Sequence, residues 1–167
     1  MKKFVFLYLC FYLSNLFGAT YNIPNGSLPP TCTKQSDTNI TCTSFNIGND
    51  DTINITSPLI ITVSGSGDIG NKAEVNKDGL YTNLTMYIGG NFIISNNAIF
   101  VGSLIVTGNV SVQNNSYFKG VIDANGFVAI SNGAEIIGTI SGNPVSLPNN
   151  FTLEGAIVSN GICIDGD

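Results

Sequence analysis

Hydrophobic and polar positions alternate along much of this chain. In one such stretch Val110 and Val112 flank Ser111, and this period of two is that of a β-strand with one buried face. From residue 86 onward the alternation recurs every 17 or 18 residues, with turn residues at matching positions. The successive lines are residues 86–102, 104–120, 121–138, 139–155 and a partial line at 156–167, with Ser103 left over.

Each line also repeats its corners and its apolar positions. Two turns rich in Asn and Gly interrupt every line, and these residue types tolerate the left-handed backbone that a corner requires. A glycine closes each line, at Gly102, Gly120, Gly138 and Gly155. Two of the apolar columns are Tyr87, Ile105, Ile122, Ile140, Ile157 and Phe100, Phe118, Ile136, Leu153.

These repeats predict an all-β fold, a single-stranded parallel β-helix (β-solenoid) with rungs of 17–18 residues and about three short strands per rung. One rung cannot bury its apolar side alone, whereas stacked rungs share a continuous core. An ordinary β-sandwich or barrel is the alternative, but it need not repeat its glycines, asparagines and apolar steps in register. We expect a right-handed coil. A left-handed hexapeptide-type coil stays open because it has the same period.

Composition divides the chain into three parts. Residues 1–19 have the lysines, the short apolar run and the small residues of a secretory signal peptide, so we expect export through the periplasm to the cell surface or the medium. Residues 20–58 do not repeat and are interpreted as an irregular N-terminal cap. Residues 59–167 are interpreted as the solenoid, beginning with an irregular rung that extrudes a polar loop at residues 64–79.

The predicted export also decides how the cysteines are interpreted. Cys32 and Cys42 bracket nine residues, and an exported chain favours their oxidation to a disulfide; two unpaired thiols are the alternative. Cys163 is then the odd cysteine, which either points outward or pairs between chains. Asn39 lies between the first two cysteines in DTNIT, which matches the stricter bacterial form of the N-glycosylation sequon, so it is a candidate glycosylation site.

The charge of the chain and the residue types that it lacks argue against several classes of function. The chain has no His and no Arg, and loss of the predicted signal leaves four lysines against eleven acids, a net charge of −7. Such a chain lacks the basic surface that nucleic acid requires, and no later segment is long and apolar enough to span a membrane. Asp123, Glu135 and Glu154 do not make the facing acid pair of a glycosidase, so no enzyme, cofactor or metal site is predicted.

The run GSLIVTGNVSVQNNSYFKGVIDANGFVAI, residues 102–130, resembles the short-rung β-solenoids of the polymer-forming, bactofilin-like class. It also resembles the solenoid portion of secreted proteins associated with the mannose-sensitive haemagglutinin pilus (MshQ-like). The resemblance covers residues 84–167. Bactofilins are cytosolic scaffolds without signal peptides, and the pilus-associated proteins are much longer, so this chain departs from both. The resemblance implies a structural, surface or adhesive role without catalytic residues.

The sequence therefore favours a secreted, non-enzymatic β-solenoid that acts as a structural or adhesive module of the cell surface or a pilus. A carbohydrate-binding or carbohydrate-active β-helix protein is the alternative. The expected partners are a second copy or another surface protein at the open C-terminal rung, or a glycan. The candidate outward binding positions are Ser111, Gln113, Tyr117, Lys119 and Glu135.

Overall fold

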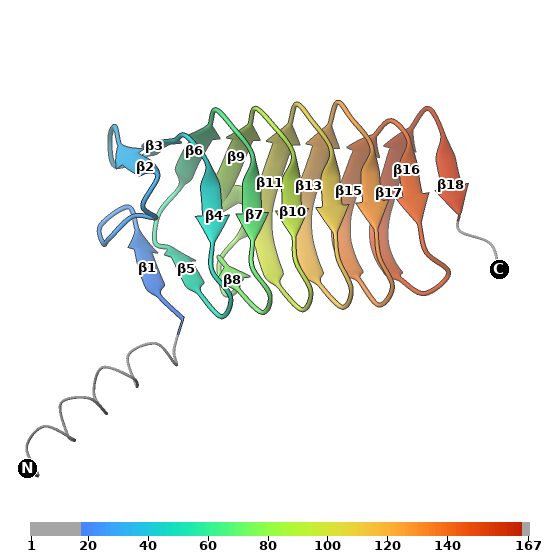
Figure 1. Cartoon of the computed structure of the whole chain (residues 1–167), viewed down its shortest axis with the longest axis horizontal. Helices are drawn as coiled ribbons and strands as arrows, with labels where there is room; N and C mark the ends of the chain where they lie inside the picture. The colour runs from blue at the N-terminus through green and yellow to red at the C-terminus, as the bar shows by residue number, and fades with distance from the viewer. Residues whose placement is uncertain (1–17, 165–167) are drawn as a thin grey trace, which may run out of the picture.

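The structure is a computed structural model that describes residues 18–164, and it confirms the predicted β-solenoid (Figure 1). The chain winds through seven turns, and each turn crosses three strand faces, here called A, B and C. Parallel turns stacked about 4.8 Å apart give a rod about 29 Å long from the first turn to the last. In Figure 1 the near strands point down and the far strands point up while the chain advances to the right, so the coil is right-handed.

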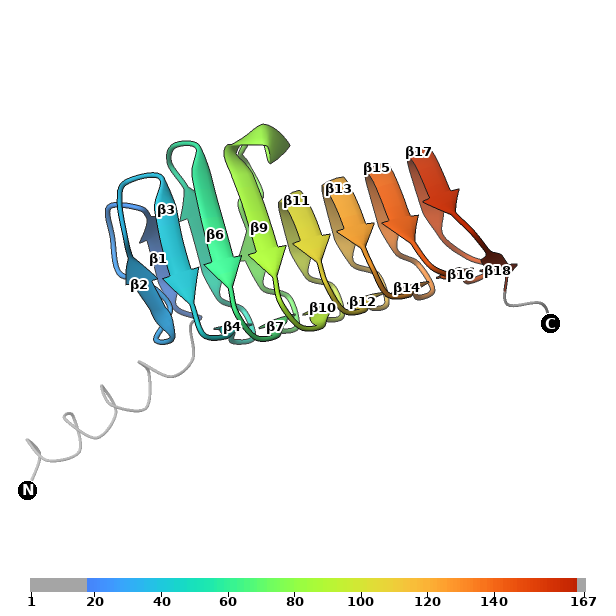
Figure 2. The same ribbon diagram turned by 90° about the horizontal axis from the view of Figure 1, so that it is seen from above.

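Faces A and B form one sheet of 11 strands, because the longer strands of the last four turns bend from one face to the other (Figure 2). Face A holds β1 (Thr20–Ile23), β5 (Thr52–Ile55), β8 (Glu74–Val75) and the first halves of β11 (Ile99–Val106), β13 (Tyr117–Ala124), β15 (Glu135–Gly142) and β17 (Thr152–Ser159). Face B holds β3 (Asn39–Cys42), β6 (Leu59–Val63), β9 (Leu84–Ile88) and the second halves of the same four strands. The short strand β2 (Cys32–Lys34) pairs with β3 in the antiparallel direction.

Face C is a separate sheet of seven strands with three residues each. In β12 (Val110–Val112) the two valines are buried and Ser111 between them is half-buried on the outer side, as the alternating pattern predicted. The other strands of face C are β4 (Phe45–Ile47), β7 (Gly67–Ile69), β10 (Phe92–Ile94), β14 (Val128–Ile130), β16 (Val145–Leu147) and β18 (Ile162–Ile164).

The inward side chains form one continuous apolar core along the axis. Phe100 and Phe118 come from consecutive turns, and their rings stack with centroids 5.6 Å apart and planes 1° apart. Phe92 meets Phe100 edge-on with centroids 6.0 Å apart. All three rings are completely buried. Burial of each phenylalanine contributes about 2–3 kcal/mol, so this aromatic stack is a substantial part of the stability of the middle turns.

Asparagines build the corners, and their amides also link one turn to the next. Asn97 and Asn115 adopt the left-handed conformation at the corner from face C to face A, with φ of 58° and 56°. The Oδ1 atom of Asn96 accepts a hydrogen bond of 3.2 Å from the backbone N–H of Asn114 one turn later. Equivalent bonds join Asn49 to Asn71, Asn71 to Asn96, Asn91 to Asn109, and Asn109 to Phe127.

The ladders correct one predicted column and confirm another. Leu104, and not Ile105, pairs with Ile122, so Ser103 belongs to the second line and is not left over. Tyr87 and Ile105 stack on each other on the outer side of face B. A slip of one residue exchanges the buried and exposed sides of a strand, which is why the predicted column mixed the two. The column Phe100, Phe118, Ile136, Leu153 pairs as predicted.

The segment interpreted as a cap takes part in the coil. The strands β1, β3 and β4 form the first turn and β5 begins the second, each paired in parallel with the next turn, so the solenoid begins at Thr20 and not at residue 59. The capping element is shorter: residues 24–38 lie over the N-terminal end, where Leu28 and Cys32 pack against the core. The predicted signal peptide, residues 1–19, lies outside the described residues except for its last two.

The polar loop of the third turn is also shorter than predicted. Residues 67–69 and 74–75 form β7 and β8 and are paired within faces C and A. Only residues 76–83 leave the coil, and they contain the 3-10 helix η1 (Tyr81–Asn83). The excursion at residues 24–38 and the one at 76–83 both lie between face A and face B, the corner that a single glycine closes in the later turns.

Substitution of Gly138 tests this corner. Its φ is +141°, and a Cβ atom there would lie 1.8 Å from the carbonyl oxygen of Gly120. We expect Gly138→Ala to lower the free energy of unfolding by about 3 kcal/mol or more, because conformation and space both exclude a side chain. Gly161→Ala is the matched control, since the nearest atom to its Cβ lies 3.7 Å away. Denaturant unfolding measures both variants, and equal stability would contradict this role of the bend.

Candidate functional site

The five predicted binding positions lie on the surface, but they do not share one face. Ser111 is the outward residue of β12 on face C, and Gln113 follows that strand at the corner. Tyr117 and Lys119 belong to the face A half of β13, and Glu135 begins β15 on the same face. An asparagine corner separates the two groups, so the structure brings together only the three residues on face A.

The phenol of Tyr117 lies in a locally acidic environment. Glu135 is its direct neighbour in the parallel register of face A, and Glu154 follows one turn later, opposite Ile137. Partial burial of the phenol, reinforced by the negative charges of Glu135 and Glu154, raises the pKa of Tyr117 above its ordinary value. Tyr117 is therefore a neutral group that can donate and accept hydrogen bonds at neutral pH.

A hollow of about 180 Å³ lies beside Lys119, at the bend between faces A and B. Gly120 and Gly138 form its floor, because they stack directly on each other and have no side chains. We call this hollow the glycine-bend groove. The residues that line it are Tyr81, Lys119, Gly120, Val121, Ile137, Gly138 and Thr139.

Tyr81 belongs to the excursion at residues 76–83, which Asn76 holds against the coil. The buried amide of Asn76 donates hydrogen bonds to the carbonyl oxygens of Val101, at 2.9 Å, and Leu80, at 3.0 Å. The helix η1 packs against β11 and β13, and Tyr81 remains 42% exposed at the edge of the groove. Sequence reasoning missed Tyr81, although the interruption of the repeat at this point was the signal that could have located it.

A second hollow, of about 310 Å³, lies at the corner between faces B and C. Tyr87 is 45% exposed there, with Thr62, Ile105 and Thr107 around it. Sequence reasoning placed Tyr87 in the core because of the slip at Ser103, and so it missed this surface. Residues 18–164 thus include two exposed tyrosines, each beside hydroxyl groups, on different corners of the rod.

The predicted disulfide is present. Cys32 and Cys42 are bonded across the antiparallel pair of β2 and β3, and this bond closes the hairpin of the N-terminal excursion. Cys163 is a free, exposed thiol at the outward position of β18. It points outward, and its pairing between chains stays a prediction.

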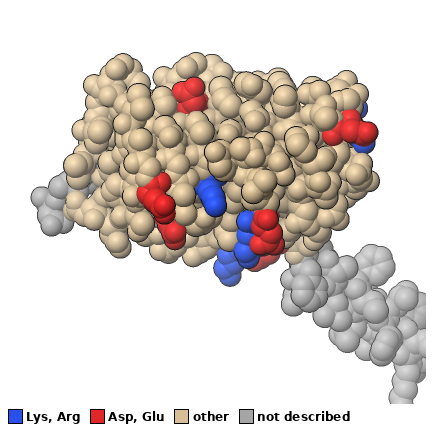
Figure 3. Space-filling view, turned by 180° about the vertical axis from the view of Figure 1, so that it is seen from behind, with Lys and Arg blue, Asp and Glu red and all other residues tan. Residues whose placement is uncertain are grey.

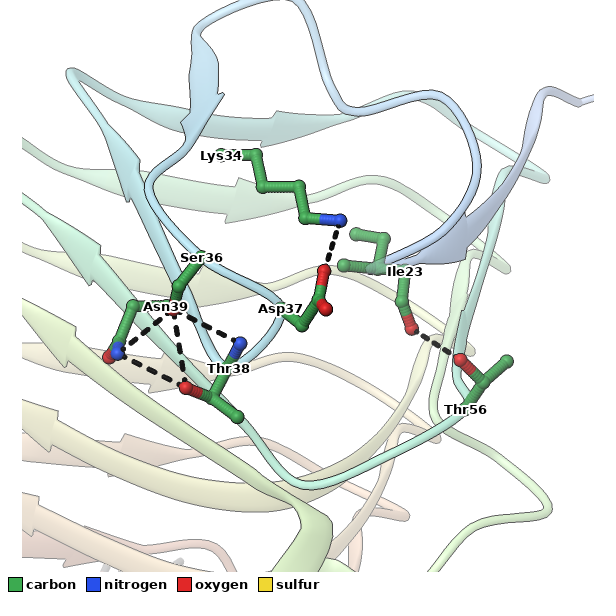
Figure 4. Close-up of polar contacts among 7 residues, drawn as sticks. All are labelled: Ile23, Lys34, Ser36, Asp37, Thr38, Asn39 and Thr56. Atoms are coloured by element: carbon green, nitrogen blue, oxygen red, sulfur yellow. Dashed lines mark hydrogen bonds and ion pairs between the residues drawn. The ribbon is translucent and has the colours of Figure 1, made fainter.

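The candidate glycosylation site is exposed at the start of β3. The amide of Asn39 donates hydrogen bonds to the hydroxyl oxygens of Ser36, at 3.3 Å, and Thr38, at 3.2 Å (Figure 4). An ion pair of 2.6 Å between Lys34 and Asp37 spans the same turn, and its hydrogen bond lowers the pKa of Asp37. Glycosylation of Asn39 stays a prediction.

The acidic side chains of the repeat lie on different faces. Asp123 is on face B, whereas Glu135 and Glu154 are on face A. Among residues 18–164, no group of three or more His, Cys, Asp or Glu side chains is placed to hold a metal ion. Within the same range, no helix has the length and apolarity required to cross a membrane.

Comparison of the chain with protein-family models, with curated proteins and with solved structures gave no significant match. The resemblance to bactofilin-like and pilus-associated solenoids therefore stays a prediction. The geometry around the exposed tyrosines is what identifies a candidate surface in this molecule.

The pKa of Tyr117 gives a test of the face A cluster. Because this pKa is higher in the folded protein, the contribution of Tyr117 to stability is complete below the ordinary value of 10.0 and is lost as the pH rises through the raised value. We expect Glu135→Gln to lower the pKa of Tyr117, which the NMR shift of its ring Cζ measures against pH. Asp123→Asn, on the face B half of the same strand, is the control, and an equal effect of both substitutions would argue against this arrangement.

Proposed function

We propose that this protein is an exported, non-enzymatic β-solenoid that serves as a structural or adhesive module at the cell surface. The observation that carries this proposal is the uninterrupted stacking of seven turns, each hydrogen-bonded to the next on all three faces. Such a rod holds its outward side chains at regular spacing over an extended surface. That property suits contact with a large partner better than enclosure of a small substrate.

The distribution of charge supports contact with an uncharged partner. Charged side chains are few on the back of the rod, and they lie singly or in small groups with wide uncharged areas between them (Figure 3). Two of the lysines are paired with acids at 2.6 Å, Lys34 with Asp37 and Lys77 with Glu74. A surface of this kind exerts little long-range attraction on nucleic acid or on anionic lipid.

The disulfide supports the proposed location. Bonds such as Cys32–Cys42 form and persist in oxidising compartments and on cell surfaces, and they are rare in the cytosol. An oxidising location agrees with the signal peptide predicted at residues 1–19.

The producing cell provides the test of export. Antibodies against the folded solenoid should label intact cells or detect the protein in the medium, because the proposed module acts outside the cell. Deletion of residues 2–19 should abolish that signal while the protein still accumulates inside. Labelling of the full chain only after permeabilisation would contradict the proposal.

The two ends of the described coil differ in a way that favours association. At the N-terminal end the excursion at residues 24–38 leaves Ile40 and Phe45 fully covered, whereas Ile162 and Ile164 in the last turn are 53% and 68% exposed. Among the described strands, β17 and β18 are paired on one side only, as are β1 and β4 of the first turn, so the difference between the ends is the exposed apolar surface. We infer that a second copy or another surface protein stacks on this turn through its own strand edge.

Light scattering over a range of concentrations tests this association. We expect the average mass to rise with concentration, because exposed apolar strands pair in water. The double substitution Ile162→Lys and Ile164→Lys should keep the protein monomeric. Ile60→Lys, at an outward and 40% exposed position of face B, is the matched control and should associate like the parent. A parent protein that is monomeric at every concentration would refute the inference.

Carbohydrate binding is the second candidate function, and one observation favours it. The glycine-bend groove has an exposed aromatic ring at Tyr81, a hydroxyl at Thr139 and an amine at Lys119 within one hollow. Aromatic surface combined with a few polar groups is the usual composition of a small-ligand site.

A further inference from the structure

The glycine-bend groove spans two turns of the rod. Its floor is the backbone at Gly120 and Gly138, and Gly155 continues the same column by one more turn. Its two walls are outward side chains of faces A and B, and Tyr81 lies at its N-terminal end. The column from Gly120 to Gly155 is about 10 Å long, and the hollow covers its first two glycines. That length suits part of an extended chain molecule and is too short for a globular partner.

A peptide cannot enter this groove by adding a strand. The strands β13 and β15, which carry the floor, are each paired with a parallel neighbour on both sides. They offer no free edge to an incoming strand, and strand addition requires one. An occupant of the groove must therefore be recognised by side chains.

The walls of the groove carry one charged side chain, that of Lys119. Lys119 is the cation, and Glu154 lies two turns away in the same outward column, with Ile137 between them. The other side chains of the walls are apolar or uncharged, such as Val121 and Thr139. The lone amine of Lys119 is set against an excess of acids in the whole chain, eleven against six lysines, so the molecule exerts little long-range attraction on a polyanion and a neutral ligand is favoured.

The remaining chemistry matches a sugar ring. A pyranose has an apolar face and a rim of hydroxyl groups, and Tyr81 offers an exposed aromatic ring beside the hydroxyl of Thr139 and the amine of Lys119. The hydrogen bonds of Asn76 hold the excursion that presents Tyr81. We propose that the glycine-bend groove binds an uncharged polysaccharide chain, with one ring against Tyr81 and the next along the glycine floor.

This inference rests on the adhesive function proposed above and names the site and ligand class for it. A hollow of about 180 Å³ contacts roughly one sugar ring, so a single site binds weakly. Adhesion then comes from many rods that engage one polysaccharide or one surface together. A repetitive, uncharged polymer is suited to such multivalent contact.

NMR titration of the exported protein tests the groove directly. The probes are cellohexaose, maltohexaose, xylohexaose and chitohexaose, with hexagalacturonate as an anionic counterpart. We expect at least one neutral hexasaccharide to shift the amide signals of Gly120 and Gly138, and hexagalacturonate to bind more weakly. Tyr81→Ala should weaken that binding about five-fold or more, because it removes the stacking surface. Thr139→Val, which keeps the shape of the side chain, should also weaken it.

Tyr87→Ala is the matched control, because Tyr87 is as exposed as Tyr81 but lies at another corner of the rod. It should leave the affinity unchanged within about two-fold. The inference is overturned if no neutral hexasaccharide shifts the groove signals at about 10 mM, if the shifts gather around Tyr87, or if both tyrosine substitutions act equally.

A second readout separates failure of the groove from failure of the adhesive function. Beads coated with the protein should adhere to cells or to immobilised polysaccharide, and Tyr81→Ala should reduce that adhesion. If beads with Tyr81→Ala adhere as well as the parent, the adhesive function stands and the groove is not its site. If beads coated with the parent do not adhere at all, the adhesive function itself fails, whatever the titration shows.

Discussion

Parallel hydrogen bonding between successive turns is the constraint on which this structure depends. Each strand pairs with the equivalent strands of the neighbouring turns. Every residue must therefore pack against the residue at the same position of the next turn, about 4.8 Å away. Large apolar residues satisfy that condition inside the coil, where the rings of Phe100 and Phe118 stack with parallel planes. The core is therefore a set of columns along the axis, and adding turns extends it without changing its cross-section.

The same constraint selects the residues at the corners. Asparagine fits for two reasons that the corner pair divides between its members. Asn97 adopts the left-handed backbone, and the side chain of Asn96 accepts a hydrogen bond from Asn114 in the next turn. Glycine fits at the bend between faces A and B because any side chain at Gly138 would collide with the turn before it. Where the chain needs more room, it leaves the coil at this same bend, and the ladders on either side continue without interruption.

In such a fold, the outward side chains and the excursions are not constrained by the stacking of turns, so they are available for function. The excursion at residues 76–83 turns a plain glycine bend into a groove, because it places Tyr81 beside Gly120. The excursion at residues 24–38 covers the N-terminal end of the core and is closed by the disulfide. Both lie where the sequence repeat is interrupted, so variation between such proteins can change the surface without disturbing the coil.

Much of the fold could be predicted from the sequence, because stacking imposes the same local pattern on every turn. The parallel coil, the column of Phe100 and the asparagine corners all leave such a signature, whereas the disulfide was predicted from the expected export of the chain. The pattern could not decide the register at Ser103. Whether this residue ends one line or begins the next, both lines keep the same period. The pattern also could not show that residues 20–58 join the coil, because the irregular spacing of their strands hides pairings that only the folded chain reveals.

The candidate site was less predictable than the fold for a related physical reason. Tyr117, Lys119 and Glu135 could be placed on one outward surface from their columns, since register relates equivalent positions in neighbouring turns. The approach of Tyr81 to the glycine floor depends on how Asn76 folds an excursion back onto β11, and no repeat encodes that contact. The coil, its corners and its period can be read from the repeat, because every turn must match its neighbours. Only the tertiary structure decided where the coil begins, which tyrosines are exposed and where a groove forms, because those properties arise from contacts between segments without a common pattern.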